Sequence, residues 1–162
     1  MENPVKTYLR ARMFNARKCA HAGFTPSDIP LISFVLKYGQ AFQAAPRPKG
    51  VRKGRAGSCF ANALVLAMDK NLNYTYVEGY GCYESHVVHH AWCINDRKEV
   101  LDRTWDKSEE CSYFGIPFRA SFIREHVRQT KVLESVITLG DLGAMNPRSL
   151  AMVGEFKQEL DA

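Results

Sequence analysis

Residues 57–72, GSCFANALVLAMDKNL, and the segment after them decide the predicted fold. Alanine, leucine and methionine dominate the first stretch and favour a helix, with Ser58 available as its N-cap. The stretches that follow, residues 73–83, 86–94 and 98–105, are short and rich in β-branched or aromatic residues. Glycine or the turn sequence NDR separates them, so we expect three antiparallel strands beside one helix.

Two helices are expected before this segment. Apolar residues recur at helical spacing in residues 4–20, which predicts a first amphipathic helix. A second helix has Ser27 or Asp28 as its cap, Pro30 in its first turn and residues 31–42 as its body. The apolar face of the first helix comprises Val5, Tyr8, Leu9, Met13 and Phe14.

The pattern after residue 107 predicts mixed structure. Residues 112–118 indicate a short strand, and residues 121–130 indicate a helix. Residues 132–139 are expected to form a strand or a mixed segment. Asn146 and Pro147 are suited to a helix start, so residues 146–160 predict a closing helix.

Length and composition predict a single domain. A chain of 162 residues with 46% hydrophobic content can bury its own core. We divide residues 1–162 into N-terminal helices in 1–45, a central core in 57–106 and C-terminal elements in 107–162. No apolar run reaches the roughly 20 residues that span a bilayer, and the basic N-terminus is unlike a signal peptide. Five cysteines without regular pairing favour free thiols, so we expect a cytoplasmic protein.

Cys59 falls in the first turn of the helix that begins after Ser58. Unpaired backbone N–H groups and the positive end of the helix dipole lie there, and both favour a thiolate over a thiol. Cys59 is therefore the candidate nucleophile, and it needs a base. The other cysteines fit small buried apolar residues; they are Cys19, Cys82, Cys93 and Cys111.

A base and its carboxylate partner are predicted from the hairpin that contains the sequence NDR. If its turn is centred on Asp96, His90 lies directly opposite Asp102 and shares one face of the sheet with it. Directly opposite residues have Cβ atoms roughly 4.5 to 5.5 Å apart, so Asp102 can accept a hydrogen bond from the imidazole. The apolar residues expected on the same face are Trp92, Ile94 and Val100.

Cys59, His90 and Asp102 then fit the roles of a generalised catalytic triad. A thiolate attacks an acyl carbon, an imidazole accepts and returns the proton, and a carboxylate orients the imidazole. These groups supply every step, so no cofactor is expected. The backbone N–H of Cys59 would stabilise the oxyanion, with a second donor among Tyr38, Gln40 and Gln43. Candidates for the substrate site are Trp92 and Tyr80, although a tryptophan in such a strand more often packs in the core.

The stretches GSCFANALVLA, YTYVEGY, HHAWCI and VLDRTWD, within residues 57–106, resemble the core of the transglutaminase-like superfamily. In that superfamily a G-x-C helix start, a strand ending in G-Y, an H-A-W strand and a V-x-D-x-T-W strand follow in this order. The resemblance implies a papain-like α+β fold, with the nucleophile helix packed on an antiparallel sheet. It also places Cys59, His90 and Asp102 at the nucleophile, the base and the orienting carboxylate.

The resemblance implies chemistry at an amide carbonyl through an acyl-enzyme. Many members have an acidic residue two or three positions after the cysteine, whereas this chain reads CFANA, with Phe60 and Asn62. The chain is small and has no obvious calcium-binding acidic cluster, unlike the large crosslinking enzymes. A cysteine peptidase or deamidase acting on a protein or peptide is therefore favoured over transglutaminase-type acyl transfer to an amine.

A run of positive charge in residues 47–55, RPKGVRKGR, supports a different function. The loop could bind an acidic protein, and a non-catalytic binding module is the main alternative to an enzyme. Nucleic acid is less favoured as a partner, because no aromatic residues are interleaved with the charges. The basic residues of the loop are Arg47, Lys49, Arg52, Lys53 and Arg55.

A zinc site is a further alternative, because several cysteines and histidines lie close together in the sequence. Zinc takes four such ligands in a tetrahedral array. Alternation along a strand sends His89 and His90 to opposite faces, so no metal is expected. The residues concerned are Cys82, His86, His89, His90 and Cys93.

Overall fold

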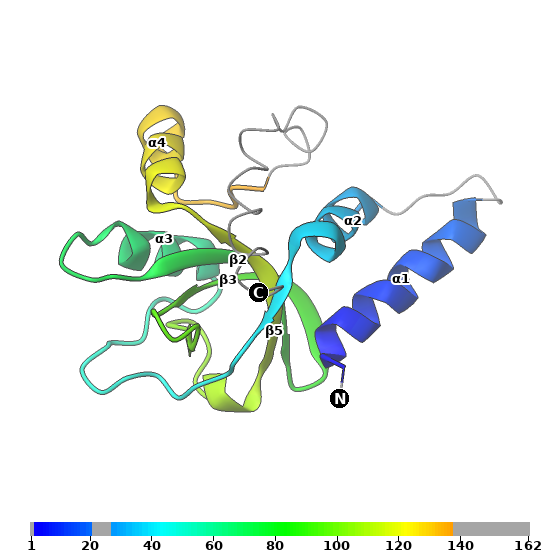
Figure 1. The fold of residues 1–162 in the computed structure, drawn as a ribbon, viewed down its shortest axis with the longest axis horizontal. Helices are drawn as coiled ribbons and strands as arrows, with labels where there is room; N and C mark the ends of the chain where they lie inside the picture. Colours follow the sequence, from blue (N-terminus) through cyan, green and yellow to red (C-terminus); the bar gives the residue numbers. More distant parts are fainter. Residues whose placement is uncertain (1, 21–26, 138–162) are drawn as a thin grey trace, which may run out of the picture.

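The computed structural model describes residues 2–20 and 27–137, which form four α-helices and five β-strands (Figure 1). The predicted α+β class is confirmed. Among these residues, no helix combines the length and the apolar character needed to cross a bilayer. The elements are α1 (Pro4–Ala20), α2 (Ile29–Tyr38), β1 (Gln40–Phe42), α3 (Cys59–Met68), β2 (Thr75–Tyr83), β3 (His86–Ile94), β4 (Val100–Leu101), the 3-10 helix η1 (Ser108–Glu110), β5 (Ser112–Phe118) and α4 (Ala120–Thr130).

The strands form one antiparallel sheet in the order β1-β5-β2-β3-β4. The turn between β2 and β3 contains two residues with positive φ, Glu84 at 46° and Ser85 at 68°, as a type I′ hairpin requires. At the start of β4, the chain meets the other edge of the sheet: the Val100 N–H donates to the carbonyl of Gln43, which follows β1, at 2.9 Å. The sheet therefore curls until its two edge strands lie together.

Alternation of side chains along the strands divides the core into two layers. One layer fills the inside of the curl, where the rings of Phe42 on β1 and Trp92 on β3 meet at 5.9 Å although their strands are not neighbours. The residues of this inner layer are Phe42, Val77, Trp92, Ile94, Val100, Cys111 and Tyr113.

The other layer lies between the outer face of the sheet and the helices. It combines residues from every helix, including Leu9 of α1, Val35 of α2 and Leu64 of α3, with Tyr76 and Ile116 of the strands. Helix α3 packs against β2 and β3. This packing places the start of α3, at Cys59, beside the strand that contains His90.

The second predicted helix was too long. Helix α2 ends at Tyr38, and Gln40–Phe42 form β1 instead of a last helical turn. Gly39 lies at the change: its N–H bonds the Val35 carbonyl at 2.8 Å, and its backbone is extended. A Cβ at this position would lie 2.5 Å from that oxygen. Pairing of β1 with β5 satisfies the backbone of Gln40–Phe42, and this tertiary contact outweighs helix propensity.

Helix α1 has the predicted bounds, but its buried face is narrower than predicted. Val5 and Leu9 are fully buried. In contrast, Tyr8 is 46% exposed and Phe14 is 59% exposed, although both were expected on the apolar face. Helix α2 covers only part of α1, so these two rings remain at the surface.

The C-terminal elements agree in part with the prediction. Strand β5 and helix α4 form over the expected residues. The described residues 132–137 contain no strand, because their backbone N–H groups at Val136 and Ile137 bond the carboxylate of Glu78 rather than a neighbouring strand. The closing helix predicted for residues 146–160 lies outside the described residues.

Candidate active site

The imidazole of His90 and the carboxylate of Asp102 form a buried pair. The distance from His90 Nε2 to Asp102 Oδ2 is 2.7 Å. His90 is 2% exposed and Asp102 is fully buried, so water does not compete for this contact. A hydrogen bond between charged or chargeable groups is strong in such surroundings.

The register that produces this contact differs from the predicted one. Cys93 pairs with Leu101, and Ile94 pairs with Val100, so the turn is centred one residue later than Asp96. Continued to Asp102, this register places the aspartate opposite Trp92 and diagonal to His90. The prediction of directly opposite residues was wrong. The side chains still share a face, because the pairing moved by two positions and side chains alternate with a period of two.

Four hydrogen bonds satisfy the Asp102 carboxylate. Oδ1 accepts from the backbone N–H groups of Thr104 at 2.7 Å and Trp105 at 3.3 Å. Oδ2 accepts from His90 and from the Tyr113 hydroxyl at 3.1 Å. Burial and the neighbouring Asp102 charge raise the pKa of Tyr113, so its hydroxyl stays protonated and donates. These bonds fix the direction in which the carboxylate meets His90.

Trp105 covers one face of the His90 ring. The two ring centroids are 3.8 Å apart, and the rings are 4° from parallel. Gly81 on β2 makes this stack possible, because a Cβ there would lie 2.6 Å from Trp105 Cη2. The indole therefore shields the imidazole from water and limits its rotation.

Cys59, the first residue of α3, lies near the His90 imidazole. Burial lowers the pKa of His90, whereas the hydrogen bond with Asp102 and the proximity of the Asp102 and Cys59 side chains raise it. The raising effect is the larger. Because Nε2 already contacts Asp102, the ring nitrogen left for the Cys59 thiol is Nδ1. The structure thus brings the three predicted residues together around one imidazole.

Cys59 differs from the other described thiols in its surroundings. Cys59 and Cys82 are half-buried, whereas Cys93 and Cys111 are buried, and of these four thiols only Cys59 influences the pKa of His90. Burial raises the pKa of Cys93 strongly and raises that of Cys111 to about 11, so both remain thiols at neutral pH. Neither has the imidazole contact that Cys59 has.

Asn62, one turn along α3 from Ser58, connects the helix to the loop beside the site. Ser58 occupies the N-cap position but makes no side-chain cap bond, contrary to expectation. The Asn62 amide instead accepts from the Arg55 N–H at 3.1 Å and donates to the Arg55 carbonyl at 2.8 Å. It also donates to Thr104 Oγ1 at 3.0 Å, two residues from Asp102. The start of α3 and the Asp102 segment are therefore held in one network.

The three side chains expected as second oxyanion donors lie in different surroundings. Tyr38 packs against the Phe34 ring at 5.0 Å, and Gln43 is exposed. The Gln40 Nε2 is buried and has no hydrogen-bond partner among the described residues. Successive pairings across the sheet join Gln40, Gly115, Gly79 and His90 in one row. Both intervening residues are glycine, and the Trp92 ring covers Gly115, where a Cβ would lie 2.8 Å from Trp92 Cη2.

Trp92 and Tyr80, expected as substrate-site residues, are both buried. Trp92 is 1% exposed and packs between Phe42 and Tyr113 inside the curl. Tyr80 is 6% exposed and belongs to the helix-side layer on the other face of the sheet. Their placement corresponds to core packing and gives neither ring a surface for a substrate.

The two neighbouring histidines point to opposite faces of β3, as strand alternation predicts. His89 Nε2 lies 2.9 Å from Glu78 Oε1, and its ring packs against Phe60 at 5.0 Å. Glu78, Tyr113 and Thr104 were not predicted as site residues. Glu78 was detectable as the one charged residue in the otherwise apolar stretch TYVEGY. Within the described residues, no three His, Cys, Asp or Glu side chains converge as a metal site would require.

Comparisons of this chain with protein-family models, with curated protein sequences and with solved structures find no match. The resemblance to the transglutaminase-like superfamily therefore stays a prediction from the motifs.

Proposed function

We propose that this chain is a thiol hydrolase with a papain-like, transglutaminase-like fold, which cleaves an amide of a protein or peptide as a peptidase or deamidase. The observation that carries the proposal is the buried imidazole of His90, which is hydrogen-bonded to Asp102 and lies close enough to the Cys59 thiol for that thiol to raise its pKa. Cys59 acts as nucleophile, His90 as acid and base, and Asp102 as the orienting carboxylate.

Acylation begins when Cys59 transfers its proton to His90. The thiolate attacks the amide carbon, a C–S bond forms, and the carbonyl electron pair moves onto oxygen. His90 then gives its proton to the amide nitrogen, the C–N bond breaks, and the amine leaves. The product of this half-reaction is a thioester on Cys59. A peptidase would release a peptide amine at this step, and a deamidase would release ammonia.

Deacylation uses the same imidazole in the opposite order. His90 accepts a proton from a water molecule, whose oxygen attacks the thioester carbon. The C–S bond breaks, the sulfur recovers the proton through His90, and a carboxylic acid leaves. Each turnover therefore adds one water to one amide bond and regenerates the thiol.

The oxyanion formed in both half-reactions needs two donors. The backbone N–H of Cys59 lies at the start of α3, where helix geometry leaves it unpaired. We assign the second donor to Gln40, because its buried amide N–H has no other partner among the described residues. Preorganised donors of this kind stabilise the transition state more than the substrate.

The arrangement of the elements also supports this class of enzyme. A helix that starts at the cysteine packs on an antiparallel sheet, and that sheet supplies the histidine and leads directly into the aspartate. The same arrangement is implied by the resemblance of residues 57–106 to the superfamily. Acyl transfer to an amine differs only in the second half-reaction, where an amine replaces water. The product mass distinguishes them: cleavage adds one water, deamidation replaces ammonia with water, and transfer replaces the leaving amine with the acceptor amine.

The direct test is alkylation of Cys59 by iodoacetamide, mapped by mass spectrometry. Cys59 should react faster than the other cysteines below neutral pH, because His90 can accept its proton. The His90→Ala variant should lose this reactivity. His86→Ala is the matched control, because His86 lies on the same strand and is exposed. Equal reactivity of Cys59 in the wild type and in the His90 variant would rule out the triad.

A second candidate function is binding of an acidic protein through the basic loop of residues 47–55. The loop is fixed in place: Gly54 N–H bonds the Arg103 carbonyl at 2.7 Å, and Arg103 Nε bonds the Arg52 carbonyl at 2.9 Å. Lys53 pairs with Asp106 at 2.6 Å. The exposed side-chain charges of three further residues have no partner within the described part of the chain; these are Lys49, Arg52 and Arg55.

A fixed loop with three unpaired cations favours an acidic partner, and its contribution can be separated from catalysis. Association with a polyglutamate peptide should weaken as salt rises, because exposed charges are screened. Replacing the three cations with alanine should remove it. If Cys59→Ala preserves every cellular effect while the triple variant abolishes them, the binding function replaces the enzyme.

A further inference from the structure

A hollow of about 220 Å³ lies beside the start of helix α3. Residues on both sides of Cys59 in the chain contribute to it, so the hollow is adjacent to the proposed nucleophile. The opposite wall comes from the segment after helix α4. Its lining consists of Gly57, Ser58, Phe60, Ala61, Leu133 and Glu134.

The two walls of this hollow are joined by one buried carboxylate, Glu78. On the side of α3, Glu78 Oε1 lies 2.9 Å from His89 Nε2, and the His89 ring supports the Phe60 ring at 5.0 Å. Tyr76 also donates its hydroxyl hydrogen to Glu78 Oε2 at 2.7 Å. Glu78 is fully buried, so these bonds are protected from water.

On the opposite side, Glu78 binds the segment that follows Glu134. The Val136 N–H donates to Oε2 at 2.8 Å, and the Ile137 N–H donates to Oε1 at 3.3 Å. The Ser135 hydroxyl also donates to Oε1. This network holds an irregular segment at a fixed position opposite Phe60, although it belongs to no helix or strand.

The chemistry of the two walls is complementary to a long cationic side chain. Phe60, Ala61 and Leu133 offer apolar surface, and Leu133 is 37% exposed although it is a large apolar residue. Glu134 is exposed and forms no hydrogen bond or ion pair with the described part of the chain. No lysine or arginine lines the hollow. The aliphatic stem of a lysine or arginine fits the apolar part, and its charge fits the carboxylate.

We propose that this hollow is a substrate subsite that selects a lysine or arginine side chain near the scissile amide, with Glu134 receiving the positive charge. The proposal rests on the proposed function, because it takes Cys59 as the point of attack. Glu78 is a positioning residue here, since it acts through His89 and through residues 135–137. A subsite of this kind would account for the bonds between the buried Glu78 carboxylate and residues 135–137, which belong to no helix or strand.

The test compares tripeptide fluoromethyl ketones that differ in one side chain, lysine, norleucine or glutamate. In these probes the Cys59 thiolate displaces fluoride, so the labelling rate reports on the occupancy of the site. The varied side chain is placed next to the ketone in one set and one residue earlier in a second set. We expect the lysine probe of one set to label about two- to fivefold faster than the norleucine probe, the range that an exposed ion pair supplies.

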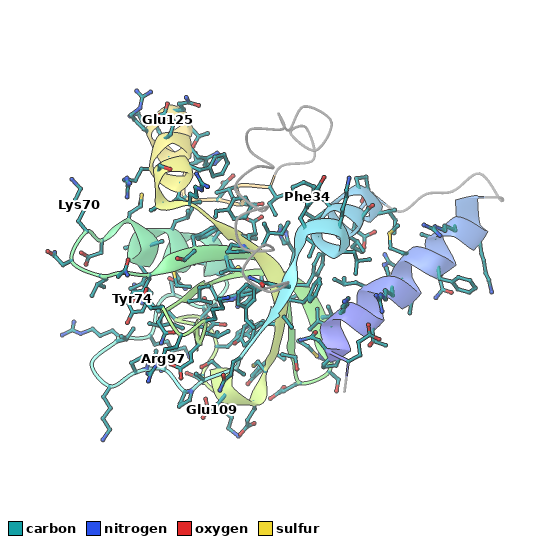
Figure 2. All side chains as sticks on the ribbon, in the orientation of Figure 1. Phe34, Lys70, Tyr74, Arg97, Glu109 and Glu125 are labelled. Atoms are coloured by element: carbon teal, nitrogen blue, oxygen red, sulfur yellow. The ribbon has the colours of Figure 1, made fainter. Side chains whose placement is uncertain are left out.

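Charge reversal provides the decisive comparison. In Glu134→Lys the order of the lysine and glutamate probes should reverse, and in Glu134→Gln the preference should disappear. Glu109→Gln is the matched control, because it removes the same charge from an exposed site far from the hollow. Figure 2 labels Glu109 at the opposite end of the molecule from Glu125 of α4. Glu78→Gln should weaken the preference while iodoacetamide still labels Cys59.

The outcomes separate the subsite from the proposed function. If iodoacetamide labels Cys59 in a His90-dependent manner but all probes of both sets react equally, the subsite is wrong and the enzyme stands. If no reagent shows dependence on His90, the proposed function is wrong and the subsite falls with it. An unchanged lysine preference in Glu134→Lys would show that a group other than Glu134 binds the lysine ammonium, which also overturns the assignment of Glu134.

Discussion

The indole of Trp105 stacks on the imidazole of His90 with centroids 3.8 Å apart and planes 4° from parallel. Trp105 follows Asp102 by three residues, and the backbone N–H of Trp105 donates to the Asp102 carboxylate that also binds His90. One short segment therefore both orients the imidazole and covers it. A base that must exchange protons with a neighbouring thiol benefits from this fixed orientation.

Gly81→Ala should disturb the stack. The new Cβ would lie 2.6 Å from Trp105 Cη2, closer than such contacts allow, and at a tight 3.3 Å from His90 Cδ2. We expect a loss of about 1–3 kcal/mol in the free energy of unfolding, typical of overpacking, and slower alkylation of Cys59. Urea unfolding and iodoacetamide labelling measure the two effects.

The control for this prediction is a double variant. Trp105→Phe lacks the indole atoms that the new Cβ would strike, so Gly81→Ala should cost less in that background than in the wild type. If Gly81→Ala lowers the free energy of unfolding equally in both backgrounds, the glycine is needed for the backbone conformation and not for the contact with Trp105.

The pKa of His90 sets the pH dependence. Burial lowers it, but the hydrogen bonds and charges of Asp102 and Cys59 raise it above its ordinary value of 6.5 overall. Because the folded-state pKa is raised, the stability contributed by protonated His90 is fully present below pH 6.5. That stability is lost as the pH rises through the folded-state pKa of His90.

Asp102→Asn should lower the pKa of His90, because an amide replaces the carboxylate charge that favours the imidazolium. Alkylation of Cys59 near pH 6 should slow about tenfold or more, as expected for loss of an opposite charge at this distance. NMR titration of the His90 ring gives the pKa directly. Tyr113→Phe is the control, because it removes one hydrogen bond from Asp102 but leaves its charge. A His90 pKa unchanged in Asp102→Asn would contradict the assigned role of the aspartate.

Helix α3 and strands β2, β3 and β5 could be predicted from sequence because local signals agree there. A run rich in alanine and leucine, three β-rich stretches and a two-residue or NDR turn between them each favour the observed element. The strand predicted for residues 98–105 was too long: β4 covers only Val100–Leu101, because after it the Asp102 carboxylate binds the backbone N–H groups of Thr104 and Trp105. Strand β1 could not be predicted in this way. Its residues, Gln40–Phe42, continue an apolar helical pattern, and only pairing with the distant strand β5 makes them extended.

The face shared by His90 and Asp102 was predictable, whereas their register was not. Sharing a face depends only on whether the pairing moves by an even number of positions. The register depends on the turn, where Lys98 has a φ of 61° and the Asn95 side chain accepts from the Arg97 and Glu99 N–H groups. The Asn62 and Glu78 networks were not predictable, since each joins segments that are distant in the sequence.

Asn62→Ala should release the basic loop from helix α3. The amide bonds both backbone groups of Arg55 and the Thr104 hydroxyl, and a Cβ on Gly54 would collide with it at 2.3 Å. We expect a loss of about 1 kcal/mol in the free energy of unfolding, because the variant removes the partly buried bond to Thr104, whereas water can replace the exposed bonds to Arg55. Hydrogen exchange at the Arg55 N–H should accelerate. Asn71→Ala, at an exposed turn, is the control and should leave both quantities nearly unchanged.

Gln40→Ala should separate attack by the thiol from stabilisation of the oxyanion. Alkylation by iodoacetamide forms no oxyanion, so its rate at Cys59 should stay close to that of the wild type. Acylation by p-nitrophenyl acetate does form one, and removing a donor should slow it by about 10²- to 10³-fold. Gln43→Ala is the control, because that exposed residue follows β1 directly and contributes its backbone carbonyl, not its amide, to the sheet. If both glutamine variants acylate at the wild-type rate, the unpartnered Nε2 of Gln40 has no part in the reaction, and the second donor lies elsewhere.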